Sequence, residues 1–124
     1  MKAGDVALVR FPFTDVATTK KRPALVLSAT TRSPRYRLVT LAMITSQTDA
    51  LKLEGDVVVE AWEVAGLLHP SLLRLAKIAT IDAELVDKTI GRLSTRDLRA
   101  AREAFRRVFS DWMPRFQRWE GAAR

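Results

Sequence analysis

Residues 4–28, GDVALVRFPFTDVATTKKRPALVLS, decide how this chain is expected to fold. They contain two apolar runs, Asp5–Phe11 and Ala24–Leu27, whose Val, Leu and Phe side chains suit buried β-strands. The polar loop between the runs ends in three cations, Lys20–Arg22, and unpaired charge is costly to bury. The stretch therefore predicts a hairpin at the edge of a small β-domain, with a basic loop exposed where a phosphate group can reach it.

Five strands are expected before the chain changes its pattern, and each is an apolar run rich in β-branched residues. Pro12 marks the end of the first strand, because proline has no N–H to donate to a β-ladder. Ser33 and Pro34 mark a loop, and Gly55 marks a turn before a strong strand. The expected strands are Val6–Arg10, Ala24–Ser28, Tyr36–Ile44, Asp56–Ala61 and Ser71–Thr80.

After the last strand the apolar residues take helical spacing. Asp82 is expected to cap a short helix that Gly91 closes, and Ser94 with Asp97 forms a capping-box-like start for a last, amphipathic helix. Pro114 is expected to end or kink this last helix. The apolar side of the short helix is expected to contain Leu85, Val86 and Ile90, and that of the last helix Leu98, Ala101, Phe105, Val108, Phe109 and Trp112.

Length and composition indicate one domain. A chain of 124 residues and 13.9 kDa can bury a single core, and 48% hydrophobic with 28% charged residues is ordinary for a globular protein. The expected fold class is α+β, mainly β, with one domain over residues 1–124. This domain would comprise a small barrel over about 4–81, helices over about 82–113 and a basic tail over 114–124.

The formal net charge of +7 and the sequence pI of about 10.6 favour polyanionic partners: nucleic acid, an acidic protein or an anionic membrane. The absence of cysteine excludes disulfides, thiol nucleophiles and thiolate metal sites. His69 stands alone beside Pro70, so neither a metal site nor a Ser-His-Asp triad is expected. With no signal-peptide pattern and no apolar run of the ~20 residues that a membrane span needs, the chain is expected in the cytoplasm.

Cleavage of RNA suits this limited set of side chains, because the 2′-hydroxyl of the substrate is itself the nucleophile. Arg22 can present two donors to the phosphate oxygens, and Thr45 or Ser46 can form a hydrogen bond at the reacting phosphate. Two structural interpretations stay open beside this one. Arg22 can be a solvated loop charge, and Thr45 can be a turn-capping hydroxyl.

Four segments together resemble the PemK/MazF family of bacterial toxin endoribonucleases. They are the opening GDVALVRFPFTD, then KKRP at 20–23, MITSQ at 43–47 and LRLAKIATID at 73–82. The resemblance covers about residues 4–95, and the last helix agrees in position and type. Each motif is short, but their order along the chain is specific to the family.

The resemblance implies a role for several individual residues. Arg22 and Thr45 would form the catalytic site. Because arginine is always protonated, we expect Arg22 to stabilise the charge of the transition state, with proton transfer assisted by Thr45 or water. Ala79 stands where relatives often carry a basic or polar residue, so one substrate contact is expected to be absent or moved. The residues expected to bind RNA are Lys20, Lys21, Ser46 and Gln47.

The resemblance also implies a fold and a function: an SH3-like barrel of the CcdB/MazF type, acting as the toxin of a type II toxin–antitoxin system. Such a toxin cuts single-stranded RNA without a metal or other cofactor, leaves 2′,3′-cyclic phosphate and 5′-hydroxyl ends, and inhibits translation. The implied partners are a second copy of the chain and a cognate antitoxin with an acidic, disordered tail, and operator DNA would be bound through the antitoxin complex. Two alternatives on the same fold stay open: a CcdB-like gyrase-binding toxin and a non-catalytic nucleic-acid-binding regulator.

Overall fold

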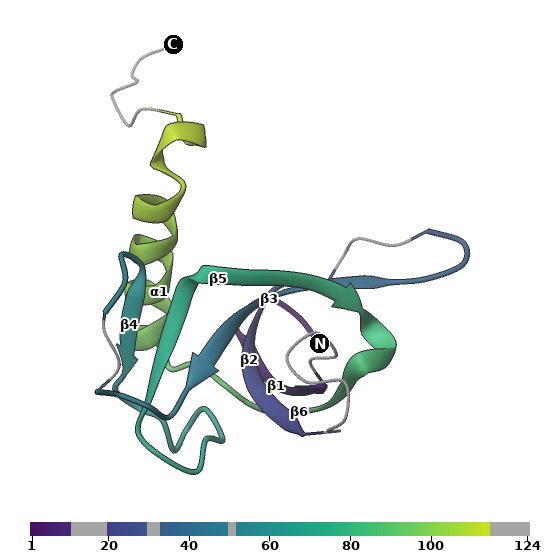
Figure 1. Cartoon of the computed structure of the whole chain (residues 1–124), viewed down its shortest axis with the longest axis horizontal. Coiled ribbons are helices and arrows are strands. Elements are labelled where there is room, and N and C mark those ends of the chain that lie inside the picture. Colours follow the sequence, from purple (N-terminus) through teal and green to yellow (C-terminus); the bar gives the residue numbers. More distant parts are fainter. Residues whose placement is uncertain (11–19, 30–32, 50–51, 115–124) are drawn as a thin grey trace.

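The computed structural model describes residues 1–10, 20–29, 33–49 and 52–114. Six antiparallel strands form one sheet in the order β4-β5-β3-β2-β1-β6. Figure 1 shows the sheet strongly curled, with α1 standing beside β4 and β5. The elements are β1 Asp5–Arg10, β2 Lys21–Ser28, β3 Leu38–Thr45, β4 Asp56–Val59, β5 Ser71–Asp82, η1 Ala83–Leu85, β6 Val86–Arg92, α1 Thr95–Val108 and η2 Ser110–Trp112, where η1 and η2 are 3-10 helices.

All five predicted strands are present, with shifted ends. The shift matters most in β2, which begins at Lys21 rather than at Ala24 and pairs with β1 from its first residue onward. The cations Lys21 and Arg22 were expected in a loop, but they stand on a strand. Their backbone is paired with Arg10 and Val9, while their side chains stay exposed. Pro12, expected to end the first strand, lies outside the described residues.

The helix expected from Asp82 to Gly91 is much shorter than predicted. Asp82 does cap a turn, and its Oδ1 accepts a hydrogen bond from Glu84 N at 2.9 Å, but η1 is a single 3-10 turn. Val86–Arg92 then form a sixth strand that pairs antiparallel with β1. Pairing satisfies the backbone groups that β1 would otherwise expose at a sheet edge. The β-branched side chains of Thr89 and Ile90 also favour a strand.

The start of α1 is as predicted, and it is tied to the end of β4. Ser94 Oγ accepts a hydrogen bond from Asp97 N at 3.1 Å, which is the expected cap. Asp97 itself is buried, and its carboxylate accepts from Glu60 N at 3.1 Å and from Ala61 N at 2.9 Å. One carboxylate therefore accepts hydrogen bonds from the two backbone N–H groups that directly follow β4.

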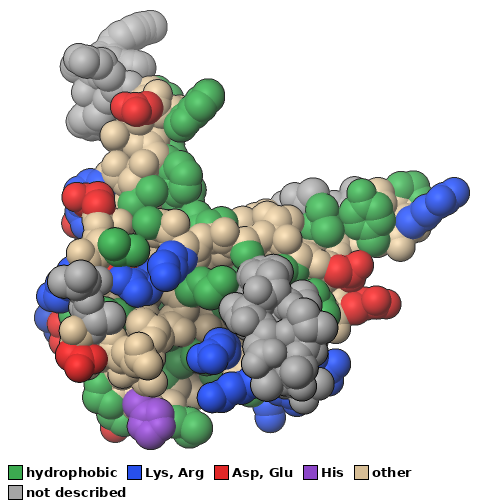
Figure 2. All heavy atoms as spheres, in the orientation of Figure 1, with side chains coloured by type: hydrophobic (Ala, Val, Ile, Leu, Met, Phe, Trp, Pro, Cys, Tyr) green, Lys and Arg blue, Asp and Glu red, His purple; other side chains and the backbone are tan. Residues whose placement is uncertain are grey.

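The far end of α1 projects beyond the sheet (Figures 1 and 2). The helix ends at Val108, well before Pro114. Most of its predicted apolar stripe packs against the protein, but Trp112 is 86% exposed.

Among the described helices, none is both long and apolar enough to cross a membrane. A cavity of about 650 Å³ lies between α1 and β2, with Arg102 and Arg106 among its lining residues.

The strands place alternate side chains in two separate cores, as a two-residue period requires. Leu25 of β2 and Ala42 of β3 belong to a first core, which α1 also covers. Ala24 and Val26 of β2 and Leu41 of β3 belong to a second core, which η1 and the start of β6 border. One face of β2 and β3 therefore packs on the first core and the other on the second core. Each polar side chain near the end of one of these strands lies on one of these two faces.

β5 changes its register against β3 halfway along. Arg74 lies opposite Met43, but the next pair is Ile78 with Ala42. The stretch Leu75–Lys77 therefore has no partner on β3, and such bulges bend a strand. The half of β5 that contains Arg74 pairs with β3 on one side and with β4 on the other.

Candidate functional site

Arg22 and Thr45 lie near the same end of the β2–β3 ladder. The ladder ends with Ala24 of β2 opposite Met43 of β3, and Arg22 and Thr45 each lie two residues beyond that pair in their own strands. Both side chains belong to the second-core face, because residues two apart in a strand share a face. The two side chains are therefore candidates for one shared site at this end of the sheet.

Arg22 has an exposed guanidinium on a fixed backbone. Its main chain pairs with Val9 of β1, while its side chain is exposed and forms no ion pair with any residue that the structure describes. A cation without a counter-ion at the end of a paired strand is available to an anionic ligand. This exposure also fits the simple alternative of a solvated charge, which stays open beside the catalytic one.

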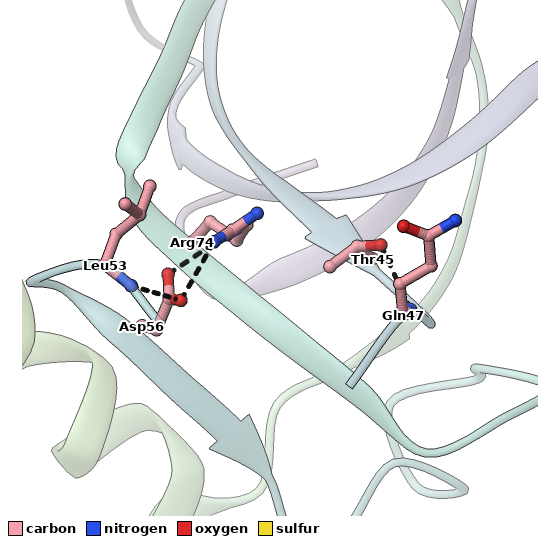
Figure 3. A network of polar contacts seen from close by, with 5 residues as sticks. All are labelled: Thr45, Gln47, Leu53, Asp56 and Arg74. Carbon is pink, nitrogen blue, oxygen red and sulfur yellow. Dashed lines mark hydrogen bonds and ion pairs between the residues drawn. The ribbon is translucent and has the colours of Figure 1, made fainter. Parts of the chain in front are cut away.

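The Thr45 hydroxyl has a structural partner. Its Oγ1 accepts a hydrogen bond from Gln47 N at 3.1 Å (Figure 3). This is the turn-forming hydroxyl that the sequence left open as an alternative. A hydroxyl that accepts one bond keeps its own proton and a second lone pair, so the same bond also fixes Oγ1 for a contact with a ligand. Ser46 and Gln47 follow, and both are exposed.

Lys21 of the basic segment does not join this pair. Lys21 alternates with Arg22 and therefore points to the other face of the sheet. Its Nζ lies 3.0 Å from Asp87 Oδ2 on β6. The hydrogen bond and charge of Lys21 hold the pKa of Asp87 below its ordinary value, against a smaller opposing effect of desolvation. Lys20 is exposed immediately before β2.

Sequence reasoning missed a buried ion pair on the same face as Thr45. Arg74 Nε donates to Asp56 Oδ1, and its second terminal nitrogen donates to Asp56 Oδ2, both at 3.1 Å (Figure 3). Asp56 Oδ2 also accepts from Leu53 N at 2.8 Å. The available signal was an arginine between Leu73 and Leu75 in an apolar strand, because such a charge requires a buried partner.

Opposing effects act on the pKa of the Asp56 carboxyl. Burial alone would raise the pKa of Asp56, but the hydrogen bonds from Arg74 and Leu53 and the charge of Arg74 hold it below the ordinary value. Ala79, the departure from the family pattern, is half-buried against the second core and lies opposite Leu41. Within the described residues, no group of three His, Cys, Asp or Glu side chains is arranged to hold a metal ion.

Comparisons with known proteins agree on one family. A family model described as the PemK-like, MazF-like toxin of type II toxin–antitoxin systems matches residues 2–109. The chain matches no curated protein.

Several solved structures are similar over most of the chain. The Mycobacterium tuberculosis toxin MazF-mt6 is 28% identical over 86% of this chain and 96% of its own, with a TM-score of 0.63. A structure of an Mtb toxin is 32% identical over 71% of this chain and 92% of its own, with a TM-score of 0.58. The MazE–MazF complex of Deinococcus radiodurans is 18% identical over 88% of this chain and 94% of the matched one, and its TM-score of 0.65 shows the likeness of fold.

Proposed function

Because this chain belongs to the PemK-like, MazF-like toxins of type II toxin–antitoxin systems and has the MazF fold, we propose that it is a metal-independent, sequence-selective endoribonuclease. Its substrate would be single-stranded RNA. The observation that supports the proposal is that Arg22 and Thr45 share one sheet face, each two residues beyond the paired Ala24 and Met43. A guanidinium and a hydroxyl near one another are the groups that such a cleavage needs.

The chemistry uses the substrate's own nucleophile. The 2′-oxygen attacks the adjacent phosphorus, the bond from phosphorus to the 5′-oxygen breaks, and the products carry a 2′,3′-cyclic phosphate and a 5′-hydroxyl. The proton of the 2′-hydroxyl leaves to water, directly or through the Thr45 hydroxyl, which gives up its own proton as it accepts one, and water supplies the proton that the departing 5′-oxygen takes up. Arg22, which stays protonated, donates to the non-bridging oxygens as their charge grows.

The remaining RNA contacts would lie on both sides of this pair. Ser46 and Gln47 directly follow Thr45 and are exposed, so they can reach a neighbouring base or phosphate. Lys20 precedes Arg22 and can hold a flanking phosphate. Lys21 would take part only by exchanging Asp87 for a phosphate, because that carboxylate now holds its ammonium. We therefore expect Lys21 to contribute less than Lys20.

The proposed partners follow from the toxin family and from charge. A cognate antitoxin with an acidic, disordered tail would cover the basic site and fold as it binds. A second copy of the chain would form a homodimer across which the RNA lies. DNA contacts would come through the antitoxin complex. An RNA-cutting toxin is expected to act in the cytoplasm, where messenger RNA is translated.

The test is incubation of purified protein with a long, defined single-stranded RNA in EDTA, followed by mapping of the ends. We expect discrete cuts with 5′-hydroxyl ends from the wild type. Arg22→Ala should lower the cleavage rate about 100- to 1000-fold, as loss of one transition-state donor does elsewhere. Its melting temperature should stay unchanged, because the side chain is exposed.

Two outcomes would contradict the proposal. If varied RNA sequences stay intact with the folded wild type, a gyrase-binding toxin or a non-catalytic regulator becomes the better interpretation. If Arg22→Ala cuts as fast as the wild type, the nuclease uses another site. Arg22→Lys is the matched control, because it keeps the charge but loses the planar pair of donors. It should fall between the wild type and Arg22→Ala.

A further inference from the structure

We propose that Arg74, oriented by Asp56, is a second phosphate-contacting residue of the RNA site and lies on the opposite side of Thr45 from Arg22. The inference rests on the proposed function, because it assigns a further contact to the same substrate. Arg74 lies outside the two segments that contain the predicted site residues, the basic segment and the segment around Thr45. It comes from β5, the strand on the other side of β3.

The sheet register places Arg74 beside the candidate pair. Two rows of residues cross the same face of β2, β3, β5 and β4. The first row is Ala24, Met43, Arg74 and Asp56, and the second row, two residues along β3, β5 and β4, is Thr45, Leu72 and Val58. Arg74 is therefore a diagonal neighbour of Thr45, at roughly 7–8 Å in an antiparallel sheet. One RNA strand that contacts Thr45 can therefore also reach Arg74.

Asp56 holds the guanidinium in one orientation. Two parallel hydrogen bonds of 3.1 Å join the carboxylate to Arg74, and Leu53 N fixes the same carboxylate at 2.8 Å. In Figure 3 the Arg74 side chain crosses β5 between Asp56 and the end of β3. A donor whose rotamer is already fixed loses little entropy when a ligand binds. The arrangement therefore suits a contact made at a defined place on a phosphate.

Burial identifies the arginine as the partner that a ligand can reach. The Asp56 side chain is only 2% exposed, whereas that of Arg74 is 12% exposed. A buried ion pair adds little net stability over an apolar pair of similar size, so the fold alone gives a weak reason for these two charges. A cation needed at the site, with a carboxylate that orients it, gives a stronger one.

The test compares binding of a short single-stranded 2′-O-methyl RNA, which has no 2′-hydroxyl to attack, at several salt concentrations. The variant is Asp56→Asn with Arg74→Gln, which removes one charge of each sign and leaves the net charge at +7. Loss of one phosphate contact reduces the slope of log K against log [salt] by about 0.7 for a single strand. We expect that reduction, together with weaker binding.

A second ion pair provides the matched control. Arg107 Nε of α1 lies 3.1 Å from Glu54 Oε2, and both side chains are exposed on the surface. Glu54→Gln with Arg107→Gln makes the same change in charge and should leave both the slope and the affinity unchanged. If the folded Asp56→Asn, Arg74→Gln protein keeps the wild-type slope, the pair is structural and the inference is wrong.

Arg74→Lys keeps the test decisive if the double variant does not fold. Lysine retains the charge but cannot form both parallel bonds to Asp56. We expect weaker RNA binding and slower cleavage per folded molecule. A lower melting temperature with unchanged binding and cleavage would overturn the inference. Binding is measured without cleavage, so the two proposals can fail separately. A wild type that binds RNA but does not cut it would refute the proposed nuclease. The salt dependence of binding would still show whether Arg74 contacts a phosphate.

Discussion

Replacement of Asp97 by alanine should destabilise the protein more than any other single change at a helix start. The carboxylate is 2% exposed and accepts hydrogen bonds from Glu60 N and Ala61 N. A hydrogen bond to a charged group contributes about 1.5–3 kcal/mol, and loss of the acceptor leaves a buried N–H without a partner. Two such bonds give a loss of about 3–6 kcal/mol. This is a large share of the ~5–15 kcal/mol that stabilises a typical domain.

The measurement is the free energy of unfolding from urea titration, with the melting temperature as a second readout. At roughly 4 °C per kcal/mol for a chain of this size, Asp97→Ala should melt about 12–24 °C lower. Asp97→Asn keeps one acceptor, the amide carbonyl oxygen, and should lose about half as much free energy. Glu103→Ala, an exposed change on the same helix, should stay within about 0.5 kcal/mol of the wild type.

A loss of less than about 1 kcal/mol for Asp97→Ala would refute this reasoning. It would mean that water or a shifted side chain satisfies the two N–H groups and that the carboxylate does not tie α1 to the end of β4. Cleavage per folded molecule should not change, since Asp97 packs beside the first core and the candidate site lies on the other face. A folded variant with lower cleavage would show that α1 and the site are coupled.

Three further changes test the site and the fold. Thr45→Ala should lower kcat about 100-fold with little change in KM, and Thr45→Ser should recover most of it; equal losses in kcat and RNA affinity would reassign the hydroxyl to binding. Gly91→Ala would put a Cβ 2.3 Å from Ala65 O, so thermal unfolding should reveal a loss of about 1–3 kcal/mol, and a neutral result would mean that the two segments can separate. The pKa of Asp56 is lowered on folding. Its contribution to stability is therefore present above the ordinary aspartate pKa of about 3.9 and is lost as the pH falls through the lower pKa of the folded protein. Over this pH range, the free energy of unfolding should fall less steeply for Asp56→Asn with Arg74→Gln than for the wild type.

The sequence predicted most of the β-structure because those strands carry their own signals. Val57–Val59 and the alternation in β3 suit strands whatever their neighbours are. The segment Val86–Arg92 does not, because Val86 and Ile90 are spaced for a helix face as well as for a strand. The open edge of β1 decides between the two, and that edge is formed by residues more than 70 positions earlier in the chain. A local pattern cannot contain this information.

The candidate site shows the same limit. Arg22 and Thr45 were predicted through the family resemblance, and their shared face depends on the register of β2 and β3, which no local pattern specifies. Arg74 was visible as a charge within an apolar run. Its partner was not, because the chain contains 14 acidic residues and only the pairing of β4 with β5 selects Asp56.

The bulge in β5 limits how the length of this chain can vary. Arg74 belongs to the second-core face and Ile78 to the first, although they are separated by an even number of positions. In a regular strand such residues would share a face, and the bulge at the unpaired stretch Leu75–Lys77 is what places them on opposite faces. An insertion or deletion of one residue there would turn one of these two side chains to the wrong face. Among related toxins that keep both side chains in place, we therefore expect sequence to change in this stretch more readily than length.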